Sequence, residues 1–186
     1  MVENSILIVD DEPNIIAALR RTLIDEQFRI YSAGDASEGL KILRTHPVNV
    51  VMSDEKMPGI SGSEFLSIVK RDFPDAIRIM LTGHASVDTA MRAVNEGEIY
   101  RFLTKPWEDL DLRFAVQAAI EKYNLEEENR RLLKIVRNQA LNLKLAERQF
   151  PGITKLDRDR DGRILLPDVS EEEIAEIISR CEADYI

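Results

Sequence analysis

Residues 5–11 read SILIVDD, a short apolar run that ends in two aspartates. An apolar run of this length, bounded by polar residues, is typical of a strand buried on both faces. Such strands belong to parallel sheets that carry helices on both faces. The stretch therefore predicts a strand of an α/β fold with two carboxylates at its carboxyl end.

The same pattern repeats up to about residue 122, where short β-branched runs alternate with amphipathic helical stretches. The helical spacing is clear in Ile15, Leu19 and Leu23, and in the segment after Gly62. The first, third and fourth apolar runs are the most continuous, so we place them in the centre of the sheet. The expected strands are 5–9, 29–33, 48–53, 77–81 and 99–103. The fold class is α/β, with a doubly wound five-stranded parallel sheet.

Polar side chains gather at the carboxyl ends of these strands, the edge where open parallel sheets bind ligands. Asp10 and Asp11 follow the first strand, and Asp54 follows the third. Three carboxylates repel one another unless one takes up a proton or a cation is bound, and an all-oxygen cluster suits Mg²⁺. Thr82 ends the fourth strand and Lys105 follows the fifth, so the set describes a phosphoryl-transfer site.

Each of these residues also has a structural interpretation. The Asp10-Asp11 pair could cap a helix, Thr82 with Gly83 could form a turn, and Lys105 could be a solvated lysine. We favour the functional interpretation because all five site residues fall at carboxyl ends of strands.

Four motifs carry a family resemblance: VDDEP (9–13), SDEKMPGISG (53–62), MLTGHA (80–85) and FLTKPW (102–107). Through them, residues 5–122 resemble the receiver domain of two-component response regulators. The resemblance implies a flavodoxin-like sheet in the order 2-1-3-4-5. It makes residues 1–122 a receiver domain.

The resemblance also implies a chemistry. Asp54 would take a phosphoryl group from a phosphohistidine on a sensor histidine kinase or a phosphotransfer protein. Mg²⁺ would be held by Asp11, Asp54 and the backbone carbonyl of Lys56, with Asp10 acting through water. Lys105 would neutralise a phosphoryl oxygen.

The same family implies a switch. Thr82 would donate its hydroxyl to the phosphoryl group, and the ring of Phe102 would turn into the space that Thr82 vacates. Ordinary core packing is the other interpretation of Phe102. The bond Lys105-Pro106 is expected to be cis, and Lys56 and His84 are expected to tune how long the phosphoryl group persists, with Lys56 slowing its loss.

A long helix is expected from Leu110 to about Arg148, where the chain contains no proline or glycine. Beyond Tyr123 a heptad fits, and its Asn129 would specify register in a parallel dimer. Polar residues at core positions leave a single solvated helix as the alternative. We favour a dimeric signalling coil that spans residues 123–150. Its d positions are Leu125, Leu132, Gln139 and Ala146, and its a positions are Lys122, Asn129, Val136 and Leu143.

The last segment, residues 151–186, contains LDRDRDGRILLPD (156–168), which has nearly the spacing of a calcium-binding loop. However, Pro151-Gly152 interrupts the entering helix, and Asp168 stands where a bidentate Glu is needed. We therefore favour a β-hairpin turned at Asp161-Gly162, followed by a helix from about Ser170.

Composition limits the partners. The 186 residues carry a net charge of −9, which does not favour binding to the negatively charged phosphates of nucleic acid. No segment has the apolar length needed to span a membrane. Cys181 is the only cysteine and the amino terminus lacks a signal pattern, so we expect a cytoplasmic protein.

Three functions follow from the resemblance. In the first, a phosphorylation-gated homodimer signals through its helix to an unknown downstream protein. In the second, the chain is a phosphotransfer shuttle or sink. In the third, it is the amino-terminal fragment of a longer response regulator, because residues 95–107 resemble receivers that precede HD-GYP-type or other enzymatic outputs. No such catalytic motif follows, so the only reactions expected of this chain are Mg²⁺-dependent self-phosphorylation and autodephosphorylation.

Overall fold

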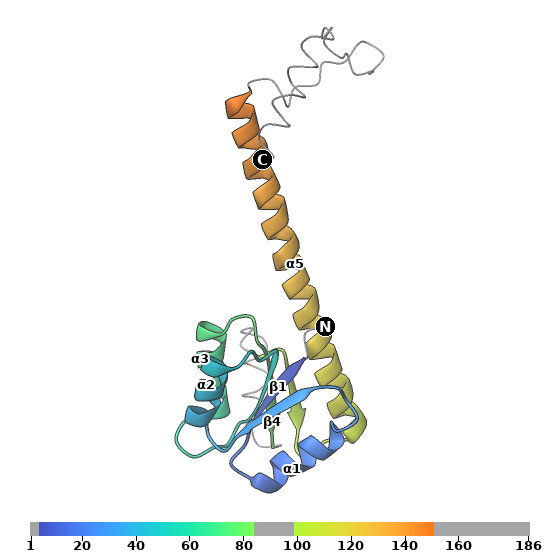
Figure 1. The fold of residues 1–186 in the computed structure, drawn as a ribbon. Coiled ribbons are helices and arrows are strands. Elements are labelled where there is room, and N and C mark those ends of the chain that lie inside the picture. Colours follow the sequence, from blue (N-terminus) through green and yellow to red (C-terminus); the bar gives the residue numbers. More distant parts are fainter. Residues whose placement is uncertain (1–3, 84–98, 151–186) are drawn as a thin grey trace. The chain divides into compact units, whose positions relative to one another are not determined.

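The computed structural model describes residues 4–83 and 99–150, which contain one five-stranded sheet (Figure 1). All neighbouring strands are parallel, and their order is β2-β1-β3-β4-β5. The strands are β1 (Ser5–Val9), β2 (Arg29–Ala33), β3 (Val50–Asp54), β4 (Ile77–Thr82) and β5 (Arg101–Thr104). The predicted fold class and strand order are confirmed.

The central strands are those with the most continuous apolar sequence. Every residue of β1 and β3 is buried, whereas β2 and β5 at the sheet edges are partly exposed. Two strand starts were misjudged by two residues each, and three strands end one residue later than predicted. β3 begins at Val50, two residues later than predicted, and the preceding Asn49 accepts a hydrogen bond from the Ser5 amide on its side-chain oxygen at 2.6 Å. β5 begins at Arg101, although Ile99 is buried. The prediction started the strand at Ile99 because an apolar residue indicates burial, but burial alone does not show that a residue pairs with a neighbouring strand.

Helices cover both faces of this sheet, with α2 and α3 on one side and α1 and the start of α5 on the other (Figure 1). Local signals set their starts. Pro13 opens α1, Asp35 caps α2 by accepting the Glu38 amide, and Ser61 and Glu64 form a reciprocal capping box on α3. The helices are α1 (Pro13–Thr22), α2 (Ala36–Thr45), α3 (Gly62–Asp72) and α5 (Asp109–Gln149).

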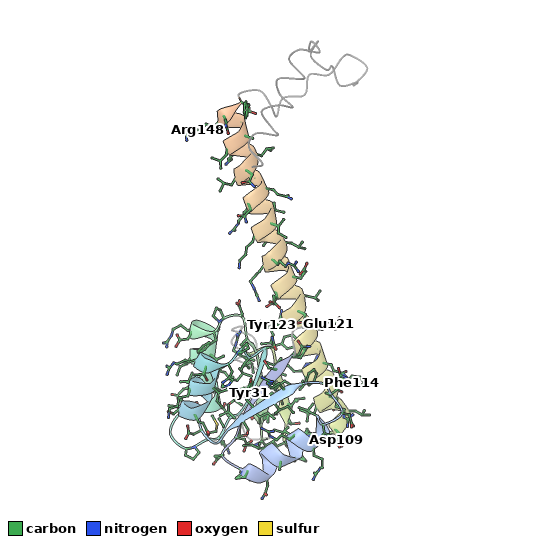
Figure 2. All side chains as sticks on the ribbon, in the orientation of Figure 1. Tyr31, Asp109, Phe114, Glu121, Tyr123 and Arg148 are labelled. Carbon is green, nitrogen blue, oxygen red and sulfur yellow. The ribbon has the colours of Figure 1, made fainter. Side chains whose placement is uncertain are left out.

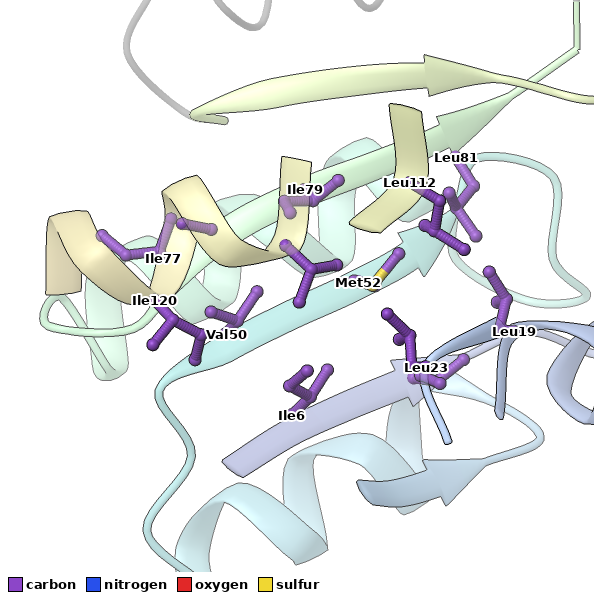
Figure 3. Packing of buried hydrophobic residues seen from close by; sticks show 13 residues of the cluster. Ile6, Leu19, Leu23, Val50, Met52, Ile77, Ile79, Leu81, Leu112 and Ile120 are labelled. Carbon is purple, nitrogen blue, oxygen red and sulfur yellow. The ribbon is translucent and has the colours of Figure 1, made fainter. Parts of the chain in front are cut away.

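Alternation along the strands divides the core into two apolar clusters, one on each face of the sheet. Towards α2 and α3, Leu7, Val51 and Met80 pack with Phe65 and other residues. Towards α1 and α5, even-numbered residues of β1 and β3 and odd-numbered residues of β4 pack with the two helices (Figure 3). The second cluster includes Ile6, Val50, Met52, Ile77, Ile79, Leu81, Leu19, Leu23, Leu112 and Ile120.

Helix α5 spans 41 residues and ends one residue beyond the predicted Arg148. Its buried residues lie between Leu112 and Ile120. Side-chain bonds add to this packing: the Thr22 hydroxyl donates to Asp109 at 2.9 Å, and Arg130 pairs with Asp75 at 3.2 Å. Residues up to Leu132 form one compact unit, and Leu133 begins the second.

The predicted hairpin and helix of residues 151–186, together with the calcium alternative, lie outside the described residues. None of the helices that the structure does describe combines the length and apolar character needed to cross a membrane.

Two leucines near the start of α5 test the packing. Replacing Leu112, which is fully buried, with alanine should lower the free energy of unfolding by about 3 kcal/mol, because it removes apolar contacts and leaves a cavity. Replacing Leu110, which is 67% exposed on the same helix, should change it by less than about 0.5 kcal/mol. Urea unfolding of both variants measures the difference, and equal losses would contradict the assigned face of α5.

Candidate functional site

Two carboxylates lie side by side at the carboxyl edge of the sheet. Asp10 follows β1 directly, and Asp54 is the last residue of the neighbouring strand β3. Asp10 is fully buried and Asp54 is 6% exposed. Because β1 and β3 are parallel and hydrogen-bonded, their carboxyl ends bring the two side chains to the same place. Two such carboxylates need a cationic partner.

Lys105 supplies that partner from the edge strand. Its Nζ lies 2.8 Å from Oδ2 of Asp10 and 2.6 Å from Oδ1 of Asp54, and its side chain is only 18% exposed. Burial acts to lower the pKa of the Lys105 ammonium, but hydrogen bonds and charge from Asp10 and Asp54 outweigh burial and raise the pKa. The lysine is therefore held in its charged form. The bond from Lys105 to Pro106 is cis, as predicted.

The other oxygen of each carboxylate accepts a backbone amide. Oδ1 of Asp10 accepts the Glu12 N–H at 2.9 Å, and Oδ2 of Asp54 accepts the Lys56 N–H at 2.9 Å. Each carboxylate is thus held at both ends, by an amide and by the shared ammonium. These contacts fix the direction in which Asp54 points.

Thr82 and Phe102 lie on the other face of the sheet. Asp54 pairs with Leu81, and consecutive strand residues point to opposite faces, so Thr82 alternates away from Asp54. The buried Thr82 hydroxyl donates to the Gly83 carbonyl at 3.1 Å. Phe102, which pairs with Met80, is partly buried against the cluster on that face. The structure therefore places Thr82 and Phe102 on a shared face, while His84 lies outside the described residues.

Asp11 and Lys56 lie at the rim of the site. Both side chains are exposed, and they line an open pocket together with Glu55, Met57, Pro58, Gly59, Ser61 and Glu64. Within residues 4–83 and 99–150, no three His, Cys, Asp or Glu side chains gather closely enough to hold a metal by themselves. The site offers oxygen donors of the kind Mg²⁺ takes, since that ion uses one or two carboxylates and keeps several waters. The donor set fits Mg²⁺, and the predicted ligands stay a prediction.

Glu55, Gly62 and Ser63 lie around the end of β3 and were not predicted as site residues from the sequence. Glu55 follows Asp54, and its carboxylate accepts the Ser63 amide at 2.9 Å and the Ser63 hydroxyl at 3.1 Å. Gly62, between the capping residues of α3, lies against the backbone of Asp54. The Ser61-to-Glu64 capping box was readable as a helix start, but nothing in the sequence indicates where that helix start sits in space.

An α/β sheet of this order, with an acidic residue after β1, an aspartate ending β3 and a lysine after β5, defines a receiver-type signalling domain. The response regulator receiver domain family matches residues 6–117, and the chain belongs to this family. The resemblance noted in the sequence is confirmed.

Relatives and solved structures agree with this family. The hydrogenase transcriptional regulatory protein HoxA of Cupriavidus necator is 38% identical over 69% of this chain, but the match covers only 26% of HoxA. A crystal structure titled adenylate cyclase, from Rhodopirellula baltica, is 36% identical, with a TM-score of 0.68 over 72% of this chain and 98% of that one. The receiver domain of an HD domain-containing protein from Pseudomonas fluorescens is 34% identical, with a TM-score of 0.65 over 69% of this chain and 94% of that one. The chain thus spans about a quarter of the length of HoxA.

Removing the lysine tests the charge balance of the site. At pH 7, in a buffer with a metal chelator so that no divalent cation replaces the ammonium, Lys105→Met should lower the free energy of unfolding by about 2 kcal/mol. The reason is that two buried carboxylates then face each other without a cation. Adding Asp54→Asn should restore part of the loss, since one of the two charges is gone. The exposed pair Lys122–Glu126 provides a control, and Lys122→Met should cost less than about 1 kcal/mol.

The pH dependence has a definite sign. A pKa that is raised on folding stabilises the folded state fully at neutral pH, and the stabilisation disappears as the pH rises through the lysine range above about 10. The deficit of Lys105→Met should therefore shrink at high pH in urea unfolding. A deficit that is constant from pH 7 to the alkaline end would contradict this account.

Proposed function

We propose that Asp54 is the phosphoryl acceptor of a two-component response regulator. The observation that supports this most directly is the contact of Lys105 with both Asp54 and Asp10 at the carboxyl edge of the sheet. In the reaction, an oxygen of Asp54 attacks the phosphorus of a phosphohistidine. The P–N bond breaks, the imidazole leaves with its electron pair, and Asp54 becomes an acyl phosphate. The donor is a sensor histidine kinase or a phosphotransfer protein.

The residues around Asp54 have distinct proposed roles. The Lys56 amide holds one oxygen of the acceptor so that the other can face the incoming group. Lys105, already charged and partly buried, exchanges a carboxylate contact for a phosphoryl oxygen as charge develops there. Asp10 keeps the ammonium near Asp54 in the meantime.

Receiver domains generally use Mg²⁺ for phosphorylation, and we propose that Asp11, Asp54 and the carbonyl of Lys56 would hold it here, with Asp10 acting through water. The ion, when bound, supplies positive charge that reduces the repulsion between the carboxylate and the phosphoryl group. The exposed Lys56 side chain at the rim would pair with a phosphoryl oxygen and would thereby slow hydrolysis.

The proposed signal leaves the site through Thr82 and Phe102. Thr82 is the last residue of β4, and its hydroxyl would turn around the end of the strand to exchange its bond to the Gly83 carbonyl for one to the phosphoryl group. Because Phe102 shares a sheet face with Thr82 and is only partly buried, its ring has room to follow. Phe102 lacks a hydroxyl, so its signal would be a change in burial at the surface around β5, on the sheet face that it shares with Thr82.

Helix α5 is the proposed output, in a homodimer. Leu125, Leu132, Val136 and Leu143 are between 51% and 66% exposed. Leu125 and Leu143 are separated by about five helical turns and so share one face of the helix. Nearer the start of α5, Phe114 is also 61% exposed (Figure 2). Long exposed apolar faces mark interaction sites. This face favours a signalling dimer that contacts a downstream protein over a shuttle or sink, which would not need it.

A longer parent protein is the second candidate. It is favoured by the short share of HoxA that the chain covers, and by neighbours whose titles name an adenylate cyclase and an HD domain-containing protein. In that case α5 would connect the receiver to an output domain of its own chain. The predicted absence of a nucleic-acid partner would then apply to this chain alone.

Mass spectrometry of the intact protein tests the assignment of Asp54 as the acceptor. Incubation with acetyl phosphate and Mg²⁺ should add one phosphoryl group to the wild type and none to Asp54→Asn, because an amide cannot act as the nucleophile. Asp25→Asn, which changes an exposed carboxylate in a salt bridge with Arg113, should be phosphorylated like the wild type. Phosphorylation of Asp54→Asn at the rate of the wild type would contradict the assignment.

The dimer is tested by light scattering with and without beryllofluoride, a phosphoryl mimic. The mimic should raise the mass of the wild type to that of a dimer. Leu132→Glu should remain monomeric, because it places a charge in the apolar face. Leu141→Glu is the matched control, since Leu141 is 55% exposed on the opposite side of α5. A wild type that stays monomeric in both conditions would argue against the signalling dimer.

A further inference from the structure

The start of α3 approaches the acceptor more closely than a side chain would allow. A Cβ atom built on Gly62 would overlap the carbonyl oxygen of Asp54. It would also lie 2.8 Å from the Asp54 carbonyl carbon and 2.9 Å from the Cα of Glu55. All three atoms belong to backbone, which cannot swing aside as a flexible side chain can. Only glycine lets the first turn of α3 reach this position.

The need for glycine here comes from space and not from backbone conformation. Among the described glycines, only Gly59 has a positive φ, of 90°, and a Cβ built on Gly59 would meet nothing within 4 Å. Gly62 is the reverse case, because its φ suits any residue and its surroundings do not. In the first turn of a helix, alanine would otherwise be the more stabilising residue.

Hydrogen bonds hold this close approach in place. The Gly62 amide donates to the Glu55 carbonyl at 3.0 Å, and the Glu55 carboxylate accepts both the amide and the hydroxyl of Ser63. On the strand side, the Glu55 amide donates to the Leu81 carbonyl at 2.9 Å. Glu55 thus ties the end of β3 to β4 on one side and to the start of α3 on the other.

We propose that Gly62, Glu55 and Ser63 form a positioning clasp that fixes the direction of the Asp54 carboxylate. The peptide unit that Gly62 touches begins at the Asp54 carbonyl, one bond from the Cα that carries the acceptor side chain. Displacing this unit moves Asp54 relative to the Lys105 ammonium and the Lys56 amide, which hold its two oxygens at 2.6 and 2.9 Å. The inference rests on the proposed role of Asp54 as acceptor.

The decisive variant is Gly62→Ala, with Gly39→Ala as its control. A Cβ on Gly39 would lie 3.1 Å from a methyl of Val9 and 3.2 Å from the Phe65 ring, so it strains the core without touching the acceptor backbone. With acetyl phosphate and Mg²⁺, Gly62→Ala should lose about 10²-fold in maximal phosphorylation rate, because a misplacement of about 1 Å has effects of this size. Gly39→Ala should lose stability in urea while keeping the rate of the wild type.

A second readout does not depend on phosphorylation. In amide NMR spectra without Mg²⁺, the Lys56 N–H signal should shift in Gly62→Ala and stay in place in Gly39→Ala, because that amide reports the position of the Asp54 carboxylate. This separates the two ideas. If Asp54→Asn were phosphorylated like the wild type, the acceptor assignment would fail while the Lys56 shift still measured the clasp.

Milder variants serve if Gly62→Ala does not fold. Glu55→Ala removes both bonds to Ser63 and should slow phosphorylation several-fold, and Glu55→Gln should recover part of the rate because its one carbonyl oxygen can still accept. The clasp is refuted by a folded Gly62→Ala that has the rate and the Lys56 signal of the wild type. Failure of Glu55→Ala to slow the reaction would equally refute it.

Discussion

The contact of one ammonium with two carboxylates is the constraint on which the rest of the domain depends. Asp10 and Asp54 are almost completely buried, and burying two like charges together is unfavourable without a cation between them. Lys105 can reach both only if β1 and β3 are neighbours and β5 ends at the same edge. The strand order is therefore a condition for the charge balance of the site.

Burial of the sheet in turn explains why the charges of Asp10, Asp54 and Lys105 meet at one edge of the sheet. Apolar side chains fill both faces up to the last strand residues, so the polar groups meet only at the edge where the strands stop. Alternation then separates two side chains at neighbouring strand ends. Asp54 lies on one face of the sheet and Thr82 on the other, so in the proposed function the end of β3 would carry the chemistry and the end of β4 would transmit it to the opposite face.

Much of this could be predicted from the sequence because it rests on local patterns. Continuous apolar runs indicated the central strands, and Asp54 and Lys105 were recognisable where those patterns ended. The bond from the Ser5 amide to the Asn49 side chain near the start of β3 could not be predicted, because it is a contact across 44 residues. Gly62 was passed over for a similar reason, since its close approach to Asp54 exists only after β3 and α3 are folded against each other.

Helix α5 has a further consequence for how the chain can change. Packing of Leu112 to Ile120 fixes the rotation of its first half about the helix axis, and the same helix continues to Gln149. Each inserted residue turns everything after it by about 100°, since a turn takes 3.6 residues. A single insertion after Tyr123 would thus carry Leu132 and Val136 round to another side. Insertions of eleven residues, about three turns, would leave them nearly in phase. For the proposed dimer, the length of α5 could therefore change only in such steps.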